Sequence, residues 1–141
     1  MNKSNQEHHR RVLATLLIVC GCLHLAVAAF WWSIIFGLAR EGYTDVLRDF
    51  KTTTAFAMTL SMVALPLVSG LALLPGRSWA GGAVLLTCVA ILIVNFMVLR
   101  QLAWPRLSPG RIVFGTVYGG PNLAIAAYGL WFVSRRRSER G

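Results

Sequence analysis

His24 is the residue whose type and surroundings most invite a chemical role. It is the only acidic or basic side chain inside the four long apolar stretches of this 141-residue chain. A buried imidazole can carry a proton, contact a ligand or bind haem iron, and with one hydrogen-bond partner it can also tie helices together. Bis-histidine haem ligation needs a second histidine, and acid–base catalysis commonly uses a carboxylate. Because the apolar stretches contain neither, a structural role is the favoured interpretation.

The three cysteines do not form a redox or zinc motif. Cys20, Cys22 and Cys88 all fall within apolar stretches. Cys20 and Cys22 have C-x-C spacing, and residues two apart on a helix point about 200° away from each other. This spacing disfavours both a C-x-x-C redox pair and a zinc clamp. We interpret all three cysteines as small apolar filler.

Glu41, Asp45 and Asp49 form the one acidic cluster with regular spacing. Their i, i+4, i+8 pattern would align three carboxylates on one helix face and suggests a cation site. Arg48 and Lys51 interleave with them, so a solvated charged face is the favoured interpretation. We therefore expect no catalytic, metal or cofactor site, and a protein that is not an enzyme.

Four apolar stretches must position these residues. Hydrophobic residues make up 56% of the chain, charged residues only 13%, and all 14 Lys and Arg lie in the tails and connections. This placement favours membrane topology over nucleic-acid binding, despite the net charge of +9. Each stretch reaches the ~20 residues that span a bilayer. The sequence predicts an all-α, four-helix transmembrane bundle with antiparallel neighbours, its helices at about 12–38, 52–74, 79–99 and 112–134.

The remaining segments are short and polar. Residues 1–11 are predicted to be a disordered basic tail in which His8 and His9 are solvated, and residues 135–141 form a second basic tail. Residues 39–51 combine charges with apolar residues at helical spacing, which predicts a short amphipathic interfacial segment between helices one and two.

The positions of Lys and Arg predict an orientation. Eight lie in the two tails and the turn at Arg77, and six lie in the other two connections. Basic residues near helix ends favour the cytoplasmic side, and the cluster Arg135–Arg137 directly follows the last apolar stretch. We expect both termini to be cytoplasmic.

The fourth stretch carries a stripe of small residues that predicts close helix packing. The stripe lies on one helical face and contains Gly115, Gly119, Asn122, Ala126 and Gly129. By helical rise, Asn122 and the adjacent Pro121 lie at the depth of His24 to within ~3–4 Å. We expect the first and fourth stretches to pack together, with His24 hydrogen-bonded to Asn122 or to the carbonyl freed by Pro121. Asn95 lies roughly 9 Å nearer the surface opposite the tails, so it is less suited to meet His24.

The first third of the chain resembles a family. The run LIVCGCLHLAVAAFWW…GLAREGYTDV is similar to the first helix and following loop of uncharacterised bacterial four-helix inner-membrane proteins, which carry a Gly-x-x-His element. Gly21, His24, Gly37 and Gly42 carry the likeness. The resemblance implies the same topology in a bacterial cytoplasmic membrane and implies no chemistry.

Three functional classes follow in order of preference. The first is a non-enzymatic accessory or interaction subunit, or a small homo-oligomer, with Gly115 and Gly119 as the contact face toward a membrane-protein partner or a second copy. The second is a small transporter or ligand-binding membrane protein with His24 in a polar cavity. The third is a subunit of a redox or lipid-modifying enzyme. An exposed glycine stripe would favour the first class, and an open cavity at His24 would favour the second.

Overall fold

The computed structural model describes residues 3–42, 53–103 and 109–138, with side chains for most of them. Within these ranges the chain is helical with no strand, so the predicted all-α class is confirmed. The helices are α1 Lys3–Arg40, α3 Thr53–Leu73, α4 Ala80–Ala103 and α5 Pro109–Ser138. Among the residues whose surroundings are described, two helical stretches, Ser4–Arg40 and Ala80–Met97, are long and apolar enough by length and composition to cross a membrane.

Helix α1 corrects the prediction of a disordered tail at residues 1–11, because it already begins at Lys3. This polar segment contains neither Gly nor Pro, and Glu7 pairs with Arg11 one turn later at 2.6 Å. Helix nucleation costs free energy, but the apolar stretch that follows is already helical. Residues 3–11 therefore only extend an existing helix, which costs much less. At the other end of the chain, α5 continues to Ser138. The predicted interfacial segment falls mostly outside the described residues.

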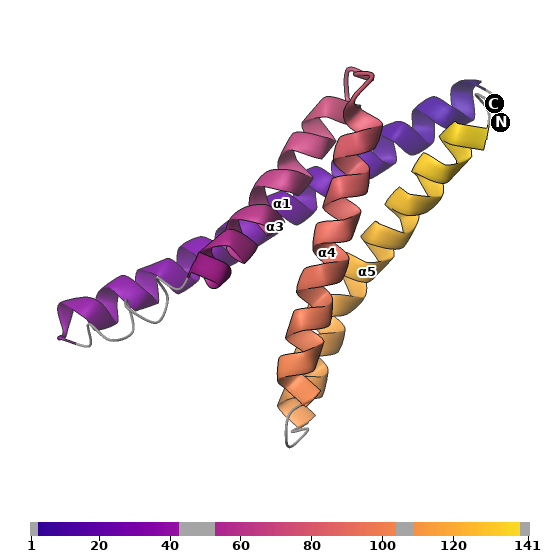
Figure 1. The fold of residues 1–141 in the computed structure, drawn as a ribbon. Helices are drawn as coiled ribbons and strands as arrows, with labels where there is room; N and C mark the ends of the chain where they lie inside the picture. The colour runs from indigo at the N-terminus through magenta and orange to yellow at the C-terminus, as the bar shows by residue number, and fades with distance from the viewer. Residues whose placement is uncertain (1–2, 43–52, 104–108, 139–141) are drawn as a thin grey trace.

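The four helices of the described ranges are arranged as two antiparallel pairs. Helix α1 packs mainly along α3, and α4 packs mainly along α5; α3 also contacts α4, and α1 contacts α5. Figure 1 shows that the two pairs cross near the end that carries both termini and the α3–α4 turn, and diverge toward the opposite end. The hairpin predicted between the second and third stretches is therefore α3–α4.

The α3–α4 turn is a Schellman motif closed by a left-handed glycine. Gly76 has φ +73° and donates from its N–H to the Leu73 carbonyl at 3.0 Å, while the Arg77 N–H donates to the Ala72 carbonyl at 3.3 Å. These two bonds satisfy carbonyls that the end of α3 would leave exposed, and only glycine adopts the required φ without strain. Pro75, which cannot continue a helix, directly precedes this glycine.

Glycines set the close packing of α1 on α3. A Cβ atom on Gly70 would lie 2.8 Å from the Ala14 carbonyl oxygen and 2.6 Å from Cγ1 of Ile18. A Cβ on Gly21 would lie 2.6 Å from Cγ of Leu67. Small residues that admit a neighbouring backbone are typical of helix contacts in membranes.

The helices are apolar on both their buried and their exposed faces. On α4 the buried positions follow a heptad-like stripe: Ala80, Val84, Thr87, Cys88, Ile91, Val94 and Asn95. Its opposite face exposes Leu86, Val89, Leu92, Ile93 and Phe96. Helix α1 shows the same behaviour, with Leu23 62% and Phe30 63% exposed. An ordinary surface helix of a soluble protein would carry polar residues on this outer face.

Candidate functional site

Cys20 connects α1 to α5 in the interior of the molecule. Its thiol donates to Oδ1 of Asn122 at a sulfur–oxygen distance of 3.5 Å, and both side chains are buried, with about 4% of their surface exposed. The two helices therefore meet at the depth expected for His24. The interpretation of Cys20 as apolar filler is wrong, because its thiol makes a hydrogen bond between helices. The signal in the sequence was its position one turn before His24 on the same face.

His24 is half-buried and bonds to its own helix. Its Nδ1 lies 2.7 Å from the Cys20 carbonyl oxygen and 3.5 Å from the Cys20 sulfur. A carbonyl oxygen can only accept, so Nδ1 carries the proton and donates it to this carbonyl. Nδ1 then has no lone pair with which to remove the thiol proton. The Cys20–His24 pair consequently lacks the arrangement that activates a cysteine nucleophile through this nitrogen.

Asn95 and Gly119 meet where α4 crosses α5. Asn95 is buried and donates from Nδ2 to the Ile91 carbonyl at 2.8 Å. Its Oδ1 lies 3.0 Å from the position that a Cβ on Gly119 would occupy. Because Asn122 lies one turn beyond Gly119, the two asparagines occupy adjacent turns of the same helix interface.

The small-residue stripe of α5 faces the interior of this chain. Its members Gly119, Asn122, Ala126 and Gly129 are all buried, and a Cβ on Gly129 would lie only 2.7 Å from Sγ of Cys88 on α4. The prediction that this face packs closely against a helix is therefore correct at these positions, and the helix is α4 of the same chain. Pairing with a second chain through Gly119 would have to displace α4. The stripe is thus not the exposed contact face that would have favoured the accessory class, and an accessory role would have to use another surface.

Two members of the predicted set lie elsewhere. Pro121 is within α5 but is exposed, about 100° around the helix from the buried Asn122. Gly115 also belongs to α5, but its surroundings lie outside the part of the chain whose side chains are described. The structure therefore gathers Asn95, Gly119 and Asn122 into one interface with Cys20, and it leaves Pro121 outside that interface.

A buried hydroxyl pair, which the sequence analysis missed, links α3 to α4. The Ser69 and Thr87 hydroxyl oxygens are 2.7 Å apart, and the Thr87 hydroxyl lies 2.9 Å from the Ala83 carbonyl and 3.1 Å from the Leu65 carbonyl. Leu65 directly precedes Pro66, so Thr87 brings a polar group to the helix segment that the proline disturbs. A hydroxyl residue inside each apolar arm of the predicted hairpin is the signal in the sequence that could have identified them.

The ends of α1 and α5 form an aromatic and basic cluster. His9 Nδ1 lies 2.7 Å from the Tyr128 hydroxyl, and the His9 ring meets the edge of Trp131 at 5.2 Å between centroids. Tyr128 stacks on Trp131, and the Arg135 guanidinium lies 5.2 Å from the centre of the Trp131 ring. The prediction that His9 is solvated is therefore wrong, because the helical N-terminal segment holds it against α5.

The chain matches no protein-family model, no curated protein and no solved structure. Among the described residues, no three His, Cys, Asp or Glu side chains lie close enough to share a metal ion. The candidate site consists of Cys20, His24, Asn95 and Asn122, whose side chains are neutral hydrogen-bonding groups, apart from His24 when it is protonated. Such groups can hold helices in register, and a histidine can additionally carry a proton.

Proposed function

We propose that the chain is a small integral membrane protein whose four helices span a lipid bilayer, and that it acts as a non-enzymatic accessory or interaction subunit. The exposed apolar surface carries the membrane part of this proposal. Only 28% of the apolar window in α1 and 39% of that in α4 is buried within the molecule. The core helix of a soluble protein would be mostly buried, and water-exposed apolar surface costs about 25 cal/mol per Å². A hydrocarbon environment removes that cost.

The non-enzymatic role is supported by how the interior polar groups are used. The Cys20 thiol, the Asn95 amide and the Ser69–Thr87 hydroxyls all bond within the chain. Interior hydrogen bonds of this kind hold transmembrane helices in one arrangement. The second class, a transporter with His24 in a polar cavity, stays a prediction from the sequence.

Membrane integration is tested by expressing the tagged full chain in bacteria and extracting membranes with alkaline carbonate. We expect the chain to stay in the membrane pellet, and reporter fusions at both ends to indicate cytoplasmic termini. Recovery of folded chain in the carbonate supernatant would refute the proposal. A periplasmic signal from both terminal fusions would refute only the orientation.

The accessory role is tested by purification in a gentle detergent followed by mass spectrometry of the intact assembly. We expect a stoichiometric complex with another membrane protein or with further copies of this chain. A monomer of about 15.5 kDa that retains no protein partner across several mild detergents would count against the accessory role.

A further inference from the structure

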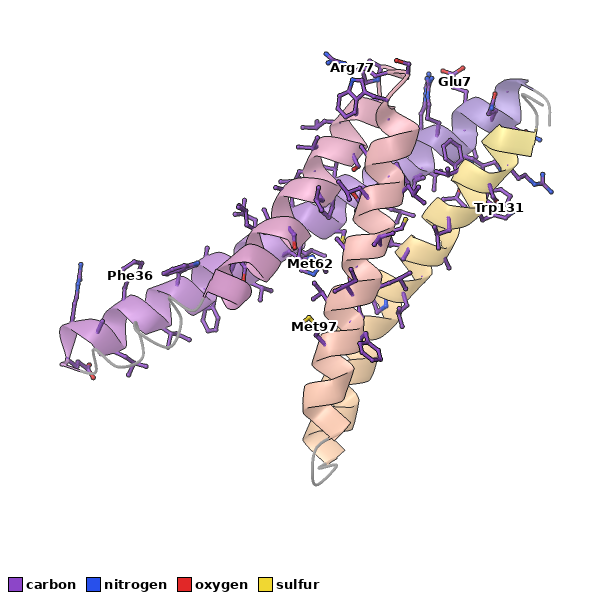
Figure 2. The ribbon with its side chains drawn as sticks, in the orientation of Figure 1. Glu7, Phe36, Met62, Arg77, Met97 and Trp131 are labelled. Atoms are coloured by element: carbon purple, nitrogen blue, oxygen red, sulfur yellow. The ribbon has the colours of Figure 1, made fainter. Side chains whose placement is uncertain are left out.

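The end of the molecule that carries the termini is strongly basic. The two tails and the turn at Arg77 contain eight Lys and Arg but only two acidic residues, Glu7 and Glu139. Four of the basic side chains are described, namely Arg10, Arg11, Arg77 and Arg135. Figure 2 shows Arg77, Glu7 and Trp131 on this end of the molecule. A concentration of positive charge at one end is complementary to an anionic partner.

Arg10 is the most informative of these residues. Its guanidinium contacts Gly76 in the α3–α4 turn, where the absence of a side chain gives it room. Its Nε is buried and has no hydrogen-bond partner among the described residues. Glu7 only partly compensates its charge, because the carboxylate lies 3.8 Å from Arg10 but 2.6 Å from Arg11. Arg10 therefore contacts the turn at Gly76, and Arg77, whose guanidinium lies 6.0 Å from the centre of the Trp79 ring, follows Gly76 in the same turn.

The surface beside these arginines is apolar and aromatic. Leu74 and Trp79 flank the turn and are 46% and 48% exposed. On α5, the Tyr128–Trp131 pair has a polar edge and an apolar face, the arrangement that favours the level of lipid headgroups. An anion bound at Arg10 and Arg77 would thus have apolar surface directly beside it, which suits a molecule that carries both a phosphate and acyl chains.

We infer that this end, formed by Arg10, the turn at Gly76 and Arg77, binds the phosphate of an anionic phospholipid, with the acyl chains lying against the apolar surface at Leu74 and Trp79. The inference rests on the proposed membrane integration. Phosphatidylglycerol is the probe used to test it, because it carries one net negative charge where phosphatidylcholine carries none. Each basic residue near a charged membrane surface contributes about 1 kcal/mol, which is about a fivefold factor in binding.

The test places the full chain in nanodiscs that contain equal amounts of phosphatidylcholine and phosphatidylglycerol. Native mass spectrometry then measures which lipid stays bound after ejection from the disc. We expect the wild-type chain to retain phosphatidylglycerol preferentially, and R10Q and R77Q each to lower this preference about fivefold. The matched control is R40Q, which removes the same charge from an exposed arginine at the opposite end of α1 and should leave the preference unchanged.

Three results would overturn the inference in a chain that enters nanodiscs. They are equal retention of the two lipids, a loss in R40Q as large as in R10Q, and displacement of the bound lipid by glycerol 3-phosphate, which would identify a soluble phosphate as the occupant. R77Q provides a second variant at an exposed position should R10Q fail to fold. A chain that does not enter nanodiscs would instead refute the membrane integration on which the inference depends.

Discussion

At the scale of single residues, Cys20 is the side chain whose role is most specific. We expect Cys20→Ala to lower the free energy of unfolding by about 1 kcal/mol, because it removes the hydrogen bond to Asn122. The matched control is Cys22→Ala, which makes the same chemical change at an exposed position two residues away. Unfolding in detergent, followed by circular dichroism, measures both variants. Equal losses in the two variants would contradict a connecting role for Cys20.

His24 should matter less for stability than Cys20. Its Nδ1–H donates to the Cys20 carbonyl, which the helical ladder already satisfies, so the loss of this bond should itself cost little. We expect His24→Leu to lower the free energy of unfolding by less than about 1 kcal/mol, measured in the same detergent titration. A larger loss would show that His24 anchors the fold. A small loss in stability together with a lost cellular phenotype would instead support the functional role.

At the scale of helices, glycines fix how close the pairs can pack. We expect Gly70→Ala to destabilise the fold by about 1–3 kcal/mol, because the new methyl group would meet the Ala14 carbonyl, which is backbone and cannot move aside cheaply. Gly82→Ala is the matched control, since it lies in α4 with no atom within 4 Å of the new Cβ. There the higher helix propensity of alanine should stabilise the protein by up to about 1 kcal/mol. Stabilisation by both substitutions would disprove the close α1–α3 contact.

The helices themselves could be predicted from the sequence, whereas their partners could not. Apolar length predicts each helix, and the period of the small residues in the fourth stretch predicts which of its faces is buried. Periodicity does not say which helix covers that face, and Gly119 proved to face α4 of the same chain. The N-terminal tail was mispredicted because local polarity says nothing of helix propagation from a neighbouring apolar stretch. His9 could therefore not be placed against Tyr128.

At the scale of the whole molecule, one substitution can distinguish a chain that lies in a bilayer from one that lies in water. Ile93 is 53% exposed near the middle of α4. In water, an exposed Ile→Lys change alters stability within about 0.5 kcal/mol, whereas lysine at the centre of a transmembrane helix costs about 2.5–3.5 kcal/mol. We therefore expect Ile93→Lys to reduce the inserted fraction sharply in a carbonate extraction assay. Ser78→Lys, at the exposed turn, is the control that should insert normally.

The unequal helix lengths have a mechanical consequence. The apolar part of α1, residues 12–38, extends over about 40 Å, whereas the apolar part of α4, residues 80–99, extends over about 30 Å. A bilayer with a core of about 30 Å fits the second upright and the first only when it tilts. Figure 2 shows Phe36 and Met97 on the diverging arms. The angle between the two helix pairs should therefore depend on bilayer thickness and increase as the membrane thins.

Spin labels can measure this response. With cysteines introduced at the exposed positions Leu38 and Phe96 in a Cys22→Ala background, we expect the distance between labels to increase from long-chain to short-chain phosphatidylcholine. A distance that is independent of chain length would mean that the bilayer deforms to fit the protein. If the distance does change, the thickness of the membrane alone sets how far apart the two helix ends lie.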